Sequence, residues 1–361
     1  TIFSRSSRVV SAIKYPAIFT PPLSQVNFII SIIAYSLTIS TLTSINTLEL
    51  IDKSTCKNCL FSRLCVILYL PYISQEDFMQ KKRVGVITFH NYDNYGAILQ
   101  SYALQKKLQE IGTQPEIIDY RCDYISNPFR LVNLKKKGLF NYIYGTIGHI
   151  CYIPRRFKCN RFRRHMRYSQ PVTQGKMQPV AGKYDIYIAG SDQIWDYKLT
   201  NFDTTYFLDF VKEGKKKCSY AASIGENLPP EEYQQKYKEL LSDFDEILVR
   251  EDYGADIVEN LTEKRPEVVC DPTLLLTAEE WDKLLVEPKY KEKYILVYQL
   301  GINKEIVDFA RRLHNKTGYR IVYIPFPLVG LLKCDCKITV GPAEWMGLFK
   351  NAEYVVSDSF H

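Results

Sequence analysis

Short apolar runs alternate along most of the chain with longer segments in which apolar residues recur at every third or fourth position. The first strand-like run, Arg83–Phe89, is followed by a polar turn at His90–Gly96 and by helical periodicity over Ala97–Ile111. Gly112 is a typical residue to end that helix, and Gln114–Tyr120 has the pattern of the next strand. This order predicts a βαβ unit near the beginning of the patterned region.

The same alternation continues to the end of the chain. Further strands are predicted over Tyr184–Ala189, Lys217–Ser223, Glu246–Arg250, Val268–Cys270, Tyr294–Leu300, Tyr319–Ile324, Lys337–Val340 and Tyr354–Ser357. Helices are predicted over Glu231–Phe244, Glu251–Leu261, Lys304–Lys316 and Pro342–Asn351. We therefore expect an α/β fold with two Rossmann-like halves, divided into a domain at residues 79–285 and the incomplete start of a second at 286–361.

The first predicted turn carries candidate chemistry. In a βαβ unit this turn lies at the carboxyl edge of a parallel sheet, where the free N–H groups of the next helix favour an anion. Asn94 and Gly96 would let the backbone approach such a ligand, although a plain tight turn explains them equally well. The three spaced glycines of a dinucleotide site are absent, which argues against NAD.

Composition narrows the class of protein. Hydrophobic residues make up 46% of the 361 residues and charged residues 24%, as in soluble globular proteins. The net charge of +7 fits anionic substrates or an acidic membrane surface and is too small to imply nucleic acid. The 10 cysteines are scattered, and Cys218 and Cys270 fall in predicted strands, so we expect buried thiols and a reducing, cytoplasmic compartment.

Residues 1–78 do not follow the pattern of the rest. The stretch Val26–Leu42 is a marginal membrane span, because a spanning helix needs about 20 mainly apolar residues. A metal or iron–sulfur site would need a fourth ligand beside Cys56, Cys59 and Cys65. We expect a non-native or weakly structured segment upstream of Met79, with a weak membrane anchor as the alternative. We also expect the chain to be a fragment, since it begins at Thr1 and stops directly after a predicted strand.

A basic cluster interleaved with aromatic residues spans Arg155–Arg167. A solvated helix face is the simpler interpretation. The functional alternative is peripheral contact with an anionic membrane, or with a phosphate-linked lipid carrier of a sugar.

Several segments at predicted strand ends resemble the polysaccharide pyruvyl transferase family in order and spacing. They are residues 92–100 (YDNYGAILQ), 190–195 (GSDQIW), 219–225 (SYAASIG), 249–251 (VRE), 271–273 (DPT) and 356–361 (VSDSFH). The likeness covers roughly Met79 to His361, and Gly-Ser-Asp-Gln-x-Trp and Ser-Phe-His are its specific elements. The resemblance implies a fold of the GT-B type, with the active cleft between two Rossmann-like domains.

The resemblance also implies an activity. Members of the family transfer a pyruvyl group from phosphoenolpyruvate to two hydroxyls of a sugar, which gives a cyclic ketal and releases phosphate. The expected acceptor is a bacterial cell-envelope polysaccharide, such as capsule or exopolysaccharide, or its lipid-linked precursor. We expect a cytoplasmic enzyme, with peripheral contact at the inner face of the cytoplasmic membrane, and no required metal or cofactor.

Two residues are candidates for the donor chemistry. Arg250 is the first choice for an anion clamp, because a guanidinium matches phosphate and carboxylate bidentately, and an ion pair with Glu251 or Asp252 is the alternative. Pyruvyl transfer protonates the enol methylene carbon, which suits a histidine. His361 occupies the matching Ser-Phe-His position, so the resemblance assigns it the general-acid role or a phosphate contact.

The remaining candidates lie in the strand-end turns. Asp93 is the nearest candidate for the general base, and a turn or capping role is the alternative interpretation of it. His90, next to the same turn, is a minor candidate. Asn94 and Gly96 are expected to shape the anion pocket. Ser191 and Asp192 are expected to bind substrate, although a helix cap explains Asp192 equally well, and Trp195 fits the core better than a sugar-stacking site.

Two rival functions remain open. A nucleotide-sugar glycosyltransferase would have the same architecture, and a non-catalytic member of a polysaccharide assembly complex would have the same motifs. An iron–sulfur carrier built on the N-terminal cysteines is a third, weaker idea.

Overall fold

The computed structural model describes residues 11–13, 82–126, 153–225, 228–300, 303–324 and 336–359. Its first sheet has the strand order β3-β2-β4-β5, and all of its pairs are parallel. The strands are β2 (Arg83–Ile87), β3 (Gln114–Ile117), β4 (Ile186–Ala189) and β5 (Lys216–Ser219). Isolated bridges at Cys218–Glu246 and Ala222–Val249 continue this sheet toward the parallel pair β6 (Leu248–Val249) and β7 (Glu267–Val268).

The second sheet has the order β1-β11-β8-β9-β10. Its strands are β1 (Ser11–Ile13), β8 (Tyr294–Tyr298), β9 (Arg320–Ile324), β10 (Cys336–Lys337) and β11 (Tyr354–Ser357). The edge strand β1 is antiparallel to β11, and the other pairs are parallel. A parallel sheet and a mainly parallel one establish the predicted α/β class.

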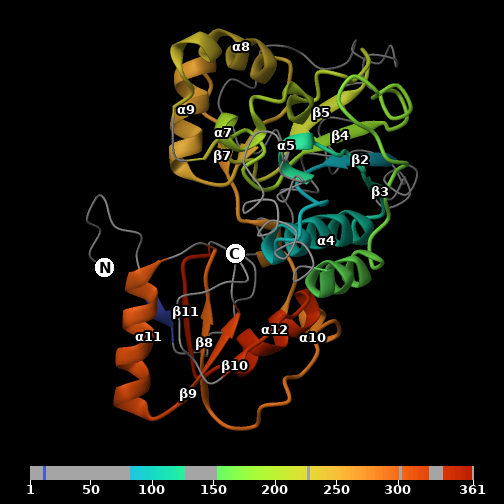
Figure 1. Ribbon diagram of the computed structural model, residues 1–361. Coiled ribbons are helices and arrows are strands. Elements are labelled where there is room, and N and C mark those ends of the chain that lie inside the picture. The colour runs from blue at the N-terminus through green and yellow to red at the C-terminus, as the bar shows by residue number, and fades with distance from the viewer. Residues whose placement is uncertain are drawn as a thin grey trace, which may run out of the picture.

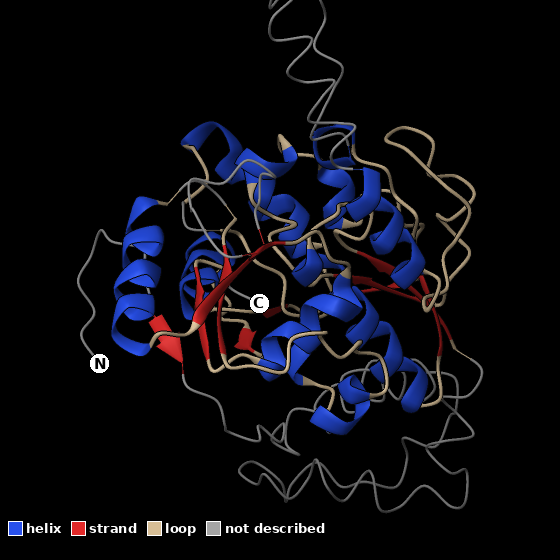
Figure 2. Ribbon diagram, turned by 60° about the horizontal axis from the view of Figure 1, so that its bottom comes forward, coloured by secondary structure: helices blue, strands red, loops and turns tan. Residues whose placement is uncertain are grey.

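Helices cover both faces of each sheet (Figures 1 and 2). Those with eight or more residues are α4 (Tyr95–Glu110), α8 (Glu231–Ser242), α9 (Asp252–Thr262), α11 (Lys304–Thr317) and α12 (Pro342–Asn351). The shorter ones are α5 (Asp123–Ser126), α7 (Tyr197–Thr200), η1 (Thr204–Phe207), η2 (Pro272–Leu274) and α10 (Ala278–Asp282), and residues 153–163 are also helical.

Helix α4 joins the cores of the two sheets, as its position between them in Figure 1 shows. Leu104 and Leu108 pack with strand β2 in one apolar cluster. Ile98 and Leu99, nearer the start of the same helix, pack with Tyr298 and other residues of the second sheet in another. Because both faces are covered, most of the helix is buried, including the polar residues Gln100, Ser101 and Gln105.

The helix at residues 153–163 corrects the expectation of a solvated basic face. Its Cys159 and Phe162 are buried in the cluster that also contains strand β8. Arg155 is only 1% exposed, and the side chain of Arg163 is 11% exposed. Exposed cations remain elsewhere on this segment, namely Arg156, Arg161 and Arg164, of which Arg156 also lies 4.0 Å from a carboxylate oxygen of Asp93. The cluster therefore divides into an inner set that packs between the sheets and an outer set that faces solvent.

The predictions about cysteines, membrane spans and metal sites fall only partly within the described residues. Cys218 is buried, which raises the pKa of its thiol to about 12, whereas Cys270 is half-buried. No helix within these ranges is long and apolar enough to cross a membrane, and the marginal span Val26–Leu42 lies outside them. The N-terminal cysteine motif also lies outside, and no cluster of metal-binding side chains occurs in the part of the chain that the structure describes.

Candidate functional site

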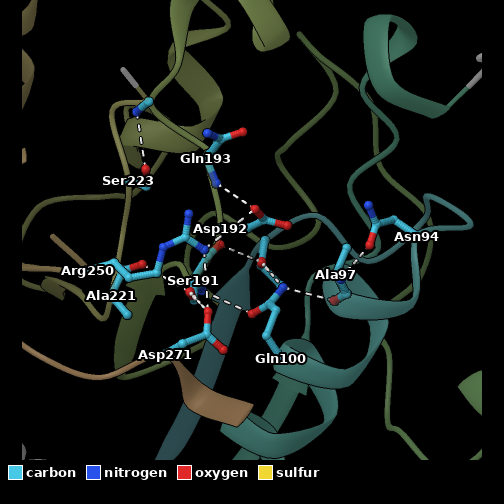
Figure 3. Close-up of polar contacts among 12 residues, drawn as sticks. Asn94, Ala97, Gln100, Ser191, Asp192, Gln193, Ala221, Ser223, Arg250 and Asp271 are labelled. Carbon is cyan, nitrogen blue, oxygen red and sulfur yellow. Dashed lines mark hydrogen bonds and ion pairs between the residues drawn. The ribbon is translucent and has the colours of Figure 1, made fainter. Parts of the chain in front are cut away.

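The carboxyl ends of the strands in the first sheet meet at one edge, where the turns that follow them form a polar network (Figure 3). The turn after β4 supplies Ser191 and Asp192, the turn after β6 supplies Arg250, and the turn after β7 supplies Asp271. In open parallel sheets ligands bind outside this edge. The topology therefore brings together residues that are up to 80 positions apart in the sequence.

Ser191 is the centre of a buried frame. Its hydroxyl donates to the Ala221 carbonyl at 3.0 Å and lies 3.5 Å from the carboxylate of Asp271. Its N–H donates to the side chain of Gln100 at 3.3 Å, and its carbonyl accepts a hydrogen bond of 2.9 Å from Thr88. The Gln100 amide in turn donates to the Thr88 hydroxyl at 2.8 Å. With Ser191 fully buried, these contacts fix the loop that carries Asp192.

Gln100 was not among the predicted site residues, although it ends the first segment that resembles the family. It is fully buried on helix α4 and makes four side-chain hydrogen bonds of 3.3 Å or less. A buried amide must satisfy its donors and acceptor, so it specifies the positions of its neighbours. The signal in the sequence that could have identified Gln100 was its polar side chain within a mainly apolar part of the predicted helix.

Arg250 is surrounded by carboxylates. Its side chain is 6% exposed, and its guanidinium lies 3.3 Å from Glu251, 3.4 Å from Asp271 and 3.8 Å from Asp192. Asp271 also accepts hydrogen bonds from the N–H and hydroxyl of Thr273, at 3.0 and 2.7 Å, and so caps η2. The structure thus contains the ion pair with Glu251 that was the alternative interpretation of Arg250.

Three further predicted site residues, Asp192, Asn94 and Gly96, lie in these turns and also have local structural roles. Asp192 has a φ of 78°, and its carboxylate accepts a 2.9 Å hydrogen bond from the Gln193 N–H. Asn94 caps helix α4 by accepting a 3.3 Å hydrogen bond from the Ala97 N–H. Gly96 is buried in the first turn of the same helix. The helix that follows, α7, is capped by Asp196, whose carboxylate accepts hydrogen bonds from the N–H groups of Lys198 and Leu199, so the capping alternative for Asp192 is wrong.

Asp93 is held by the helix at residues 153–163. Its side chain is 8% exposed, and one carboxylate oxygen accepts a 2.8 Å hydrogen bond from Arg163. Arg163 also donates to the carbonyls of His90 and Tyr92 at 3.0 and 2.9 Å. One guanidinium therefore fixes the whole turn after β2, and Asp93 takes part in fixing it.

His361 lies outside the described residues. The strand that leads toward it ends at the carboxyl edge of the second sheet, where the Asp358 carboxylate accepts a 2.8 Å hydrogen bond from the Leu300 N–H. Arg155 reaches this edge from the other side, because its guanidinium lies 4.2 Å above the ring of Tyr95, which packs against Tyr298. Burial raises the pKa of Tyr298, and Arg155 opposes that rise. The two sheets are thus joined beside the candidate site.

The side chains of His90 and Trp195 are both buried. The His90 ring is 2% exposed and lies 3.1 Å from the Thr88 carbonyl and 3.0 Å from a carboxylate oxygen of Asp119. Trp195 is fully buried, and its indole N–H donates to the Tyr206 carbonyl at 3.2 Å, in the core position that we favoured.

The His90–Asp119 contact predicts a pH-dependent part of the stability. Burial alone would raise the pKa of Asp119, but hydrogen bonds from His90 and Arg121 lower it to about 2. Since the folded-state pKa is depressed, the stabilisation is complete above the unfolded pKa of about 4 and is lost as the pH falls toward 2. Asp119→Asn is therefore expected to lose about 2 kcal/mol at pH 7 and less at pH 3.

Urea unfolding of both proteins across this pH range measures the difference. Asp252→Asn, which removes a carboxylate whose side chain is 88% exposed, is the control and should keep the wild-type pH dependence. A constant gap between Asp119→Asn and the wild type from pH 7 to pH 3 would refute the assignment.

Parallel sheets with a polar network at their carboxyl edge define an α/β protein that binds its ligand at strand ends. A model of the polysaccharide pyruvyl transferase family matches residues 94–361, and the chain belongs to this family. It is therefore a transferase with a role in polysaccharide pyruvylation. No curated protein matches the chain. The matched segment includes each candidate site residue except Asp93 and the minor candidate His90, which lie just before it.

Proposed function

We propose that the protein transfers a pyruvyl group from phosphoenolpyruvate to two hydroxyls of a cell-envelope polysaccharide or its lipid-linked precursor. The family match over residues 94–361 carries this proposal, and the strand-edge network around Arg250 supports it. We further propose that residues 79–285 and 286–361 belong to two Rossmann-like domains of the GT-B type, since each range contains its own set of parallel strands.

In the proposed reaction the methylene carbon of phosphoenolpyruvate takes a proton from His361, and the first sugar hydroxyl attacks the adjacent carbon. The C–O bond to phosphate then breaks, and the second hydroxyl closes the ketal. One of the two hydroxyl protons replaces the proton that His361 gave, and the other leaves with the phosphate. A positioned acid contributes about 10²–10⁴-fold to such a step.

The strand-end residues take the other roles. Arg250 binds an anionic group of the donor, and Asn94 and Gly96 bring the start of helix α4 close to it. Ser191 and Asp192 bind substrate from the turn after β4. Asp93 accepts a hydroxyl proton, for which it must loosen its hydrogen bond with Arg163.

Phosphate release from phosphoenolpyruvate, measured with lipid-linked or synthetic sugar acceptors, tests the function. Release that requires an acceptor is the expected result. Binding of a nucleotide-sugar without binding of phosphoenolpyruvate would overturn the proposal in favour of a glycosyltransferase. Binding of phosphoenolpyruvate without release, whatever the acceptor, would instead identify a non-catalytic member.

We place this activity in the cytoplasm, with the outer face of the helix at residues 153–163 against an anionic membrane. Phe157 is 67% exposed on that face, beside the exposed Arg156, Arg161 and Arg164. Each cation near such a surface contributes about 1 kcal/mol, so replacing the three arginines by glutamine should weaken binding to phosphatidylglycerol vesicles about 100-fold.

A matched variant controls for net charge in this vesicle experiment. Replacing Arg311, Arg312 and Lys316, which are exposed on helix α11, removes the same charge from another surface. Equal binding of the two triple variants in co-sedimentation would rule out this face as the membrane contact.

A further inference from the structure

The three carboxylates around Arg250 differ in how firmly the protein holds them. Asp271 is 5% exposed and is also hydrogen-bonded to Thr273, and Asp192 is 14% exposed and tied to its own loop. The side chain of Glu251 is 31% exposed. Glu251 is therefore the most accessible carboxylate of the group.

The side chain of Glu251 does not cap the helix that follows it. Glu251 occupies the N-cap position of helix α9, but its side chain makes no capping hydrogen bond. One carboxylate oxygen lies 3.3 Å from Arg250, and the other accepts a hydrogen bond from the hydroxyl of Ser223. A carboxylate at an N-cap ordinarily bonds to the helix N–H groups, so this one is directed to the arginine instead.

The charges around Arg250 oppose the binding of an anion. One guanidinium faces three carboxylates, so a phosphate or carboxylate brought to it meets like charges at close range. An anionic donor can take a place on the guanidinium if one carboxylate moves away. Movement of Asp271 would also break the cap of η2, whereas movement of Glu251 breaks only its contacts with Arg250 and Ser223 among the described residues.

We propose that the donor exchanges with Glu251 on Arg250, and that the released Glu251 carboxylate is a catalytic base for an acceptor hydroxyl. The inference rests on the proposed function. The O–H bond of the first hydroxyl breaks as its oxygen bonds to the carbon of the donor, and Glu251 takes the proton, which leaves the proton of the second hydroxyl to Asp93. Glu251 then gives this proton to the departing phosphate. The base becomes available only when the donor is in place, which couples donor binding to activation of the acceptor.

Glu251→Gln keeps the shape of the side chain and removes its charge. We expect this variant to bind phosphoenolpyruvate at least as tightly as the wild type, because a competitor for Arg250 has been neutralised. We expect kcat to fall about 10²–10⁴-fold and the rise of kcat with pH on the acidic side to disappear. Calorimetry of the full chain with phosphoenolpyruvate measures the first effect, and acceptor-dependent phosphate release measures the second.

Glu251→Asp retains the carboxylate and should recover part of kcat, whereas Asp252→Asn removes the exposed neighbouring charge and should behave as the wild type. A structural role for Glu251 would weaken donor binding together with turnover. Weaker binding of phosphoenolpyruvate by Glu251→Gln, or an unchanged kcat, overturns the inference. A wild-type protein that neither binds phosphoenolpyruvate nor releases phosphate would contradict the proposed function itself, which is a different outcome.

Discussion

Replacement of Arg250 by glutamine is expected to abolish phosphate release and to lower the free energy of unfolding by about 3–5 kcal/mol. The stability loss follows from the buried carboxylates that the variant leaves without their cation, above all Asp271, which is 5% exposed. Removing one partner of a buried ion pair is costly because the remaining charge stays out of water. The loss of activity follows from the missing anion clamp.

Arg265 provides a matched control, because three carboxylates surround it as well. Asp256, Glu259 and Asp252 lie 2.6, 2.8 and 3.9 Å from its guanidinium, but its side chain is 45% exposed. Exposed ion pairs are screened by solvent, so Arg265→Gln should leave both stability and activity near the wild-type values. Urea unfolding and phosphate release measure the two effects for each variant.

Arg250→Lys separates charge from geometry in the same experiment. A lysine keeps the positive charge near the carboxylates but lacks the planar fork that binds phosphate or carboxylate bidentately. We expect most of the stability to return while activity stays low. If Arg250→Gln proves as stable and active as Arg265→Gln, the carboxylate cluster contributes neither to the fold nor to the proposed reaction.

The regular elements were largely predictable from the sequence, because local signals decide them. Helix α12 and strand β11 have the predicted bounds, since Pro342 suits the first turn of a helix and Tyr354–Ser357 is a short β-rich run. Strand β6 was predicted over Glu246–Arg250 and is limited to Leu248–Val249. The apolar run was visible, but the backbone pairing that limits a strand depends on its neighbours in the sheet.

The inner face of the basic helix could not be predicted in this way. Arg155 and Arg163 have the same sequence surroundings as their exposed neighbours Arg156 and Arg164. Their partners, Tyr95 and Asp93, are on a helix and in the turn before it, about 60–70 positions earlier in the chain, and only the folded protein brings them together. The sequence therefore predicted the charge of the cluster but not its division into two faces.

The candidate site, too, could be predicted only in part from the sequence. Each of its motifs could be recognised at a strand end, and the parallel topology places strand ends at one edge. The contacts that give the residues their roles are between motifs, such as the hydroxyl of Ser191 near Asp271 and the side chain of Gln100 with the Ser191 N–H. Spacing along one strand or helix does not determine such contacts, so the ion pair of Arg250 with its neighbour Glu251 was considered, but its contacts with Asp192 and Asp271 were not.

Replacement of Gly190 by alanine is the other substitution from which we expect a large effect. Gly190 has a φ of 127°, and an added Cβ would lie 2.2 Å from the backbone carbonyl oxygen of Tyr220. A backbone atom cannot rotate aside, so the turns after β4 and β5 must move apart. The hydrogen bond between Ser191 and Ala221 would then be lost. We expect a destabilisation of about 3 kcal/mol or more, from the strained backbone and the overpacked contact together.

Gly175 and Gly214 separate these two causes. Both have a positive φ, of 75° and 77°, and an added Cβ at either would meet no atom within 4 Å. Alanine at these positions carries the conformational cost alone, about 1–2 kcal/mol, and should leave binding of phosphoenolpyruvate unchanged. Unfolding free energies and calorimetric binding of the three variants make the comparison. Equal stability of all three would mean that the contact between the two turns is not tight. The site would then tolerate movement of Ser191, so the buried frame would not be what fixes the position of Asp192 beside Arg250.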